Sequence, residues 1–300
     1  MKTNEKLLLG IYTRSPLHVG CGTSVDIVDM PVTRERITNF PVIPSSSLKG
    51  VLRQHGRDTF GGEGNPVVNL LFGNEDDAAT KDDQGKEQAY AGAVIIGEGK
   101  LLAFPVRSLK GCFAWVTCPT VLRRFQRDWG GSFPVPDVEP DACIASDAVA
   151  QEQTVVLEEY PLSVEEDKTS ELNAVASALA PVCNDPVWQA ELAERLVILA
   201  DDNFQHFVTA CTEIVDRIEM NPATRANQQL FNQENIPCEA LFYSVCTIVD
   251  SRRPGDASDA GARFRELFPE STAYLQIGGD ETVGLGLCEV LCLAEPSGAN

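Results

Sequence analysis

The chain has 300 residues, of which 43% are hydrophobic, enough for a substantial core in one large domain or two. No apolar run approaches the about 20 residues needed to cross a bilayer, and Met1 to Lys6 carry no signal-peptide cleavage site, so we expect no membrane insertion. The formal net charge of −20 argues against nucleic-acid binding over the whole surface. However, residues 1–130 hold 16 Lys and Arg against 14 Asp and Glu, whereas residues 131–300 hold 8 against 30, so a polyanion is expected on the N-terminal half.

Strands and helices are predicted along the chain without a strict repeat, which is typical of an α+β fold. Residues 74–91 are crowded with charge and predict a flexible solvated insertion. Two strand-like runs around Asn221-Pro222 predict a projecting β-hairpin over about 212–236. Strands are further predicted at 7–13, 93–96, 101–106, 155–157 and 239–250, and helices at 45–57, 120–129, 186–200 and 262–268.

The ten cysteines show no metal-binding spacing, and the three histidines lie far apart. A structural zinc site is therefore not expected. Buried free thiols in a reducing cytosol are the simplest interpretation, and this indicates a cytoplasmic protein.

One short run combines three features that point to a nucleic-acid backbone. It holds a glycine-flanked loop at His18 to Thr23, a lone acid at Asp29, and a helix start with serines and basic residues between Ser45 and Arg53. Glycines let a ligand approach the backbone closely, and a helix start with nearby cations binds phosphate. The run therefore indicates a phosphate backbone held beside a reactive carboxylate.

An ordered set of motifs resembles the RAMP superfamily of CRISPR proteins, and most of all the repeating backbone subunits of type III-B (Cmr) effector complexes. The motifs are the His18 loop, Val28-Asp29-Met30-Pro31, Arg34-Glu35-Arg36, Phe40 to Arg53, Leu71-Phe72-Gly73, Phe104 to Gly111, Phe113 to Pro119, Leu157-Glu158-Glu159, Glu234 to Pro237, Leu241 to Ser244 and the glycine loop of Gly278 to Gly286.

The resemblance implies a single RAMP domain over 1–300, with a modified ferredoxin-like (RRM-like) palm, an inserted subdomain and a projecting thumb hairpin. It implies copies of the chain stacked along a CRISPR guide RNA, together with other type III-B effector subunits. A complementary target RNA would be kinked by the thumbs and cut at regular intervals. The cutting step would depend on Mg²⁺ or another divalent cation.

Asp29 matches the cleavage aspartate of this family. RNA carries its own nucleophile, the 2′-OH, so alignment and charge neutralisation are enough for cleavage. A single carboxylate can recruit hydrated Mg²⁺, and Asp26 is a second candidate for sharing the metal. By the same resemblance, His18 acts in acid–base catalysis or orients the RNA, and a structural role in fixing the glycine loop is the alternative. Glu234 matches an acid at the base of the thumb that reaches a neighbour's cleavage site, and a surface salt bridge is the alternative.

Guide phosphates are expected at Ser45, Ser47, Lys49 and Arg53, for which simple helix capping is the alternative. The glycine loop would press against RNA or form a plain turn, and two departures from the family pattern are Leu285 in this loop and Gly97-Glu98 before the 101–106 strand. Further RNA-binding candidates are Arg34, Arg36, Arg107 and Lys110, and the loop glycines are Gly278, Gly279, Gly284 and Gly286.

The leading hypothesis is an endoribonuclease subunit that is active in the assembled ribonucleoprotein. The alternatives are a scaffold that binds guide RNA without cutting, and a type III-A backbone counterpart. A small-molecule enzyme built on the glycine loop is disfavoured, because a Walker lysine and Rossmann spacing are both missing from the sequence.

Overall fold

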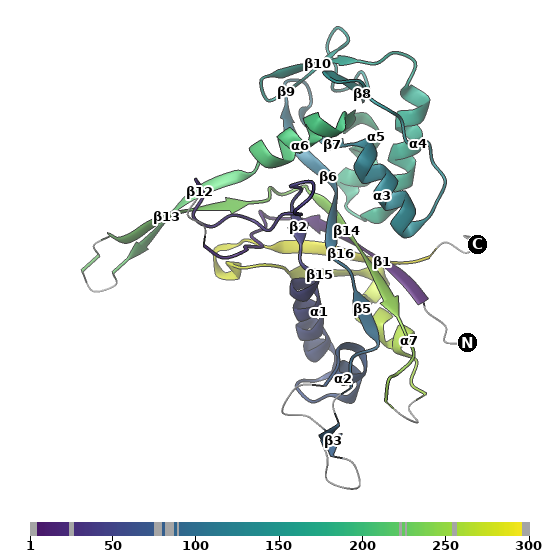
Figure 1. Ribbon diagram of the computed structural model, residues 1–300, viewed down its shortest axis with the longest axis vertical. Coiled ribbons are helices and arrows are strands. Elements are labelled where there is room, and N and C mark those ends of the chain that lie inside the picture. The colour runs from purple at the N-terminus through teal and green to yellow at the C-terminus, as the bar shows by residue number, and fades with distance from the viewer. Residues whose placement is uncertain are drawn as a thin grey trace.

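A continuous twelve-stranded sheet runs through the body of the molecule (Figure 1). The computed structural model describes residues 5–23, 27–74, 80–81, 87–88, 90–221, 224–225, 227–253 and 257–295. Strand β1 (Glu5–Thr13) lies at the centre of one half, antiparallel to β14 (Leu241–Ile248) on one side and to β16 (Leu287–Ala294) on the other. Its run from Leu7 to Leu9 is fully buried, as expected for an apolar strand covered on both faces.

The long strand β6 (Gly99–Ser108) joins the two halves of this sheet. Its first part, up to Ala103, pairs with β14, and its second part, from Phe104, pairs with β7 (Cys112–Thr117). The other strands are β2 (Val42–Ile43), β5 (Val94–Ile96), β8 (Ala142–Ala145), β9 (Thr154–Leu157), β10 (Tyr160–Val164), β11 (Leu196–Leu199) and β15 (Thr272–Gln276). A separate pair is formed by β3 (Thr80–Lys81) and β4 (Glu87–Gln88).

Helices cover the sheet in two groups (Figure 1). Helix α1 (Ser45–Phe60) packs on β5, β15 and α2 (Pro66–Phe72), and α2 in turn packs on α7 (Ala260–Arg265). The second group is α3 (Pro119–Trp129), α4 (Thr169–Leu179) and α5 (Pro186–Arg195), which contact β6, β8, β11 and β7. Helix α6 (Asp201–Ala210) leads into the hairpin, and 3₁₀ turns lie at Ala180–Val182, Pro269–Ser271 and Glu281–Val283.

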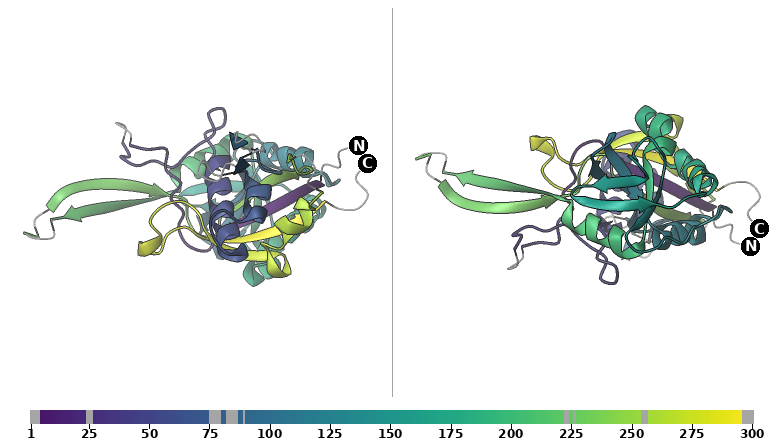
Figure 2. Two further views of the ribbon diagram at one scale, coloured as in Figure 1. Left: turned by 90° about the horizontal axis from the view of Figure 1, so that it is seen from below. Right: turned by 90° about the horizontal axis from the view of Figure 1, so that it is seen from above.

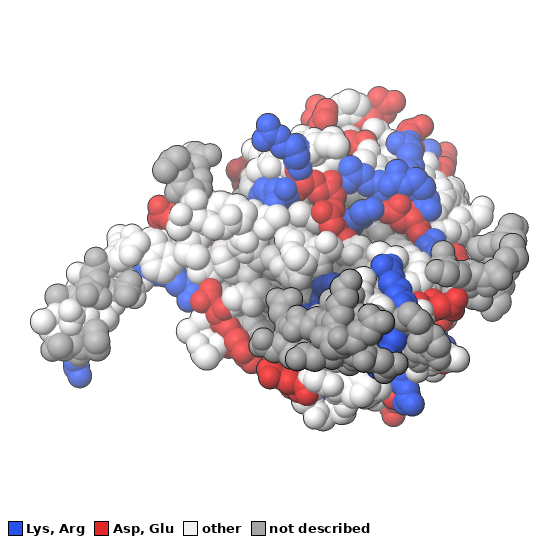
Figure 3. All heavy atoms as spheres, turned by 60° about the horizontal axis from the view of Figure 1, so that its bottom comes forward, with Lys and Arg blue, Asp and Glu red and all other residues white. Residues whose placement is uncertain are grey.

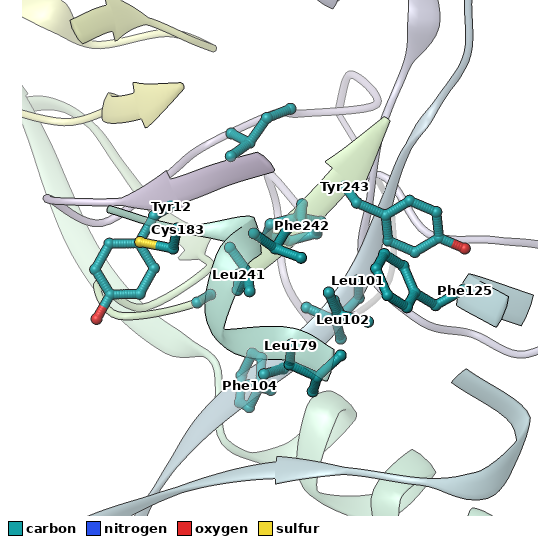
Figure 4. Packing of buried hydrophobic residues seen from close by; sticks show 14 of the residues in the cluster. Tyr12, Leu101, Leu102, Phe104, Phe125, Leu179, Cys183, Leu241, Phe242 and Tyr243 are labelled. Carbon is teal, nitrogen blue, oxygen red and sulfur yellow. The ribbon is translucent and has the colours of Figure 1, made fainter. Parts of the chain in front are cut away.

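Aromatic side chains fill the core between the sheet and the second helix group. Trp115 packs edge-to-face against Trp188 with ring centroids 5.0 Å apart, and Tyr12 lies 5.9 Å from Trp188. Figure 4 shows buried side chains of this core, among them Tyr12 of β1, Phe104 of β6 and Phe125 of α3. These contacts pack the second helix group closely against the sheet.

The hairpin of β12 (Glu213–Met220) and β13 (Asn227–Asn235) projects away from the body, opposite the end where both chain termini lie (Figure 2). It occupies the segment where the sequence predicts a hairpin over about 212–236. Exposed apolar side chains stand along it, including Ile218 and Leu230, which face each other across the two strands.

The predicted α+β fold is confirmed, but the predicted helix over 186–200 is wrong at its C-terminal end. Asp185 caps the helix as expected, accepting hydrogen bonds from the main chain of Val187 and Trp188. The helix ends at Arg195, because Leu196–Leu199 are all buried and pair with β7 and β8 as strand β11. Much of the predicted insertion at 74–91 lies outside the described residues. In the described ranges, no helix has the length and apolarity to span a membrane.

Candidate nucleic-acid interface and cleavage site

The segment that carries Asp29 runs alongside β13 at the root of the hairpin. The N–H of Met30 donates to the carbonyl of Asn232 at 3.1 Å, and the N–H of Glu234 donates to the carbonyl of Met30 at 3.0 Å. Asp29 and Asn232 are joined twice. The Asp29 N–H donates to Asn232 Oδ1 at 2.7 Å, and the Asn232 N–H donates to Asp29 Oδ2 at 2.9 Å. The half-buried Asp29 carboxylate is therefore fixed to the hairpin itself.

His18 meets the same strand two residues further on. Its Nδ1 lies 2.7 Å from the carbonyl oxygen of Glu234, and the residue is only 6% exposed. Alternate positions on a strand are about 7 Å apart, so β13 holds His18 and Asp29 close together. A Cβ on Gly20 would lie 2.6 Å from His18 Nε2. Glycine at this position therefore keeps the space beside Nε2 clear.

Glu234 is buried, and both of its carboxylate oxygens are used within the chain. Oε2 accepts from the N–H of Val32 at 2.9 Å, while Oε1 accepts from Arg34 and, at 2.8 Å, from Thr212 Oγ1. The side chain thus ties the segment after Asp29 to the base of β12. Such a paired, buried carboxylate anchors backbone. Its ion pair with Arg34 is buried, so the alternative of a surface salt bridge is wrong, whereas the reach to a neighbour's cleavage site stays a prediction.

Three of the four further basic candidates are committed to internal contacts. Arg34 also donates to the carbonyls of Asn39 and Val208, Arg107 pairs with Glu158, and Lys110 donates to the carbonyls of Asp147 and Ala150. The fourth, Arg36, is exposed and has no partner among the described residues. On the face shown in Figure 3, Lys and Arg lie among Asp and Glu over the body.

The start of α1 has the features of a phosphate site. Its first turn contains no acidic residue, and no side chain caps it at Pro44. The N–H groups of Ser45 to Ser47 are therefore available to donate to a ligand. Lys49 lies within the next turn. Burial, and then the like charges of Arg53 and Arg252, lower the pKa of Lys49. Cations close enough to lower the pKa of one another favour an anionic ligand.

The glycine loop between β15 and β16 packs its backbone onto the His18 segment. The Gly279 N–H donates to the His18 carbonyl at 3.0 Å, and a Cβ on Gly278, which has φ +80°, would lie 2.2 Å from that oxygen. Gly286 has φ +79°, and a Cβ there would lie 2.2 Å from the carbonyl oxygen of Ile277. Gly279 and Gly284 face open space. Two glycines therefore serve internal packing, and two are accessible to a ligand.

Sequence reasoning missed Asn232, Gln233 and Asp280. The only signal for Asn232 and Gln233 was the polar run Asn232 to Asn235, which is unusual for a strand, and the only signal for Asp280 was its place in the glycine loop. Gln233 and Asn235 are each 1% exposed and bond to each other at 2.9 Å, and Gln233 Nε2 also donates to Asp280 Oδ2 at 2.8 Å. A buried polar network therefore joins the hairpin to the glycine loop.

The site suits a weakly coordinated cation better than a closed metal centre. Within the described ranges, no three His, Cys, Asp or Glu side chains gather to hold a metal ion. Asp29 Oδ1 has no hydrogen-bond partner there, so one carboxylate oxygen is available. This donor set fits Mg²⁺, which keeps most of its water and takes one or two carboxylates alongside a phosphate. Asp26 lies outside the described residues.

Comparison with known proteins places the chain in a family. The model of the RAMP superfamily matches residues 11–289, and the chain belongs to this superfamily. The chain is 36% identical over 292 residues to the CRISPR system Cmr endoribonuclease Cmr4 of Pyrococcus furiosus, covering 94% of each.

Solved structures agree with this placement. The crystal structure of oligomeric Cmr4 from Pyrococcus furiosus matches with a TM-score of 0.74 and 31% identity, over 98% of this chain and 99% of that one. A chain of the type III-B Cmr-beta complex bound to cognate target RNA matches with a TM-score of 0.68 and 19% identity, over 97% of both chains. The latter likeness concerns the fold.

Proposed function

We propose that this chain is the guide-RNA-binding backbone subunit of a type III-B CRISPR ribonucleoprotein, and that it cuts complementary target RNA at regular intervals. Support comes from the superfamily match and from the Cmr endoribonuclease that is 36% identical to it. The observation that carries the proposal is the double hydrogen bond between Asp29 and Asn232, which puts a carboxylate at the root of a projecting hairpin.

In this proposal, the half of the sheet around β1, β14 and β16 is a modified ferredoxin-like palm, and the β12–β13 hairpin is the thumb. The guide lies across the palm, with phosphates at the start of α1 near Ser45, Ser47 and Lys49. Arg53 contributes charge while one of its nitrogens donates to the carbonyl of Phe72 at 2.6 Å. A thumb that bends the guide–target duplex delivers one target linkage to Asp29.

Cleavage then needs few groups from the protein. The target's 2′-oxygen attacks the adjacent phosphorus, the bond from phosphorus to the 5′-oxygen breaks, and a 2′,3′-cyclic phosphate and a 5′-hydroxyl result. Asp29 orients the linkage, and His18 Nε2 accepts the 2′-OH proton or gives one to the leaving oxygen. Mg²⁺ or another divalent cation, held through Asp29, would neutralise charge on the phosphate. Glu234 positions His18 through its carbonyl, and it holds the segment after Asp29 through its N–H, which donates to Met30, and its carboxylate, which accepts from Val32.

Assembly supplies the affinity that a single acidic chain lacks. Each copy offers a few phosphate contacts. When copies stack along one guide, each bound copy raises the effective concentration of the guide for the next copy. The partners are the guide RNA, the target RNA, further copies of the chain and other type III-B subunits. All ten cysteines are free thiols, which supports a cytoplasmic location.

The test is reconstitution of the chain with its sister subunits and a guide of known sequence. A labelled complementary RNA should give a ladder of products at constant spacing in the presence of Mg²⁺, and an RNA of scrambled sequence should stay intact. Guide and target that bind in full, with no product, would identify the chain as a scaffold. Failure to retain any guide RNA would refute both roles.

A further inference from the structure

Asp280 of the glycine loop contacts both strands of the hairpin. Its Oδ2 lies 3.3 Å from Nη2 of Arg217 on β12 and accepts a 2.8 Å hydrogen bond from Nε2 of Gln233 on β13. The glycine loop belongs to the body of the molecule, whereas the hairpin stands out from it (Figure 2). One carboxylate oxygen thus bridges two strands of a projecting element and a fixed loop.

The backbone around Asp280 is held in place, so its side chain has a defined direction. Asp280 sits in the left-handed region at φ +65°, which Asp tolerates better than most residues. Its carbonyl accepts from the N–H of Val283 at 3.1 Å and of Leu285 at 3.3 Å. The loop is tied to the body by Gly279 at the carbonyl of His18 and by Gly286 at the carbonyl of Pro16, at 2.8 Å.

These contacts close a circuit through the proposed cleavage site. Asp280 holds β13 through the side chain of Gln233. The main-chain carbonyl of the next residue, Glu234, accepts from the ring of His18. The His18 carbonyl in turn accepts from the N–H of Gly279, which precedes Asp280. An isolated two-stranded hairpin is only marginally ordered in water, so its direction depends on contacts at its base. Arg217 Nε is buried without a hydrogen-bond partner, so Asp280 is the counter-charge for a guanidinium that is already short of acceptors.

We infer that Asp280 is a positioning residue that sets the angle of the hairpin to the body, and hence the target linkage that reaches Asp29. This consequence for cleavage depends on the proposed function, whereas the mechanical role of Asp280 does not. A change at Asp280 should therefore alter hairpin order first, and the choice of cut site as a result.

The first test needs no activity. Amide hydrogen exchange of the full chain is compared for wild type, Asp280→Asn and the control Glu281→Gln, an exposed neighbour in the same loop. Asn keeps the size and the tolerance for positive φ but removes the charge opposite Arg217. We expect amides in β12 and β13 to exchange about fivefold faster in Asp280→Asn, with β1 and the control unchanged. Unchanged exchange in the hairpin, or an equal rise in β1, would overturn the inference.

A double-variant cycle and a product map complete the test. The double variant Arg217→Gln, Asp280→Asn should exchange its hairpin amides little faster than either single variant. Fully additive effects on the exchange rates would contradict a shared contact. The complex assembled with Asp280→Asn should bind target RNA normally. Its cut sites should be displaced by a nucleotide, or each cut site should give products of several lengths. An unaltered product map would show that hairpin angle does not select the linkage. If the proposed function is wrong, the wild-type complex will not cut target RNA. The hydrogen-exchange comparison still tests the mechanical role of Asp280 in that case.

Discussion

The Nδ1 atom of His18 donates its hydrogen to the main-chain carbonyl of Glu234 at 2.7 Å. A carbonyl oxygen can only accept, so this contact places the ring hydrogen on Nδ1 and leaves Nε2 as the acceptor of a neutral ring. The same strand binds Asp29 two residues earlier. The hairpin root therefore sets both the position of the carboxylate and the tautomer of the imidazole.

Gly20→Ala should reduce cleavage by roughly 100-fold while the complex still assembles, because a Cβ 2.6 Å from Nε2 forces the His18 ring out of place. Single-turnover cleavage and target binding are measured on the same preparations. Cys21→Ser, a small change at the exposed neighbour, is the control. Normal cleavage by Gly20→Ala would limit His18 to a structural role.

Asn232→Ala should lower the single-turnover cleavage rate roughly tenfold without weakening target binding. The substitution removes the acceptor for the Asp29 N–H but keeps the main-chain donor to Asp29 Oδ2. Gln229→Ala, on an exposed position of the same strand, is the matched control. A loss confined to binding would show that Asn232 contacts RNA and does not orient Asp29.

Lys49→Gln should weaken guide binding and lower the slope of log affinity against log salt concentration by about 0.7, the value for one phosphate contact on a single strand. The control is Arg57→Gln, which removes the same charge at the far end of α1. Filter binding over a range of salt concentrations measures both. Equal effects of the two variants would indicate a general charge effect, with no phosphate site at the start of α1.

The sequence predicted the elements whose signals are local. The helix that begins at Ser45 and the Asp185 cap lie where expected, because apolar periodicity and, at Asp185, side-chain capping act within a few residues. The serines do not cap the helix at Ser45, whose N-cap is Pro44. The end of the 186–200 helix could not be found this way. Leu196–Leu199 become a strand only because β7 and β8 flank them, and both come from elsewhere in the chain.

The candidate site also divides into local and distant parts. Asp29 and His18 stand in motifs that the sequence shows, whereas Asn232 meets Asp29, and Asp280 meets Gln233, through contacts that span about 200 and 47 residues of sequence. Glu234 is a different case. The motif predicts an acid that reaches a neighbour's cleavage site or forms a surface salt bridge, but the sequence does not reveal that Arg34 and Thr212 both bond its Oε1 within the chain.

Acid should selectively remove the stability that Asp128 provides. Burial opposes its charge, but hydrogen bonds from Lys100, at 2.6 Å, and from Arg127 hold the pKa of Asp128 below its usual 3.8. A carboxyl with a lowered pKa stabilises the fold above pH 3.8, and this contribution disappears as pH falls through the folded-state pKa.

Urea unfolding from pH 7 to pH 3 checks this prediction with Asp128→Asn. The variant should be less stable than wild type at pH 7, and the difference should shrink towards pH 3. Asp137→Asn, at a carboxylate that is 92% exposed beside Arg123, should differ little from wild type at any pH. A constant difference for Asp128→Asn would rule out the titration of this carboxyl as the cause.

The most direct measurement compares cleavage by complexes assembled with wild-type chain and with Asp29→Asn, at equal guide and target occupancy. Asn keeps the shape and the bond from the Asn232 N–H but loses the negative charge. We predict normal binding with cleavage reduced by at least about 100-fold at every cut site. Cleavage at the wild-type rate and positions would contradict the claim that Asp29 at the hairpin root is where target RNA is cut.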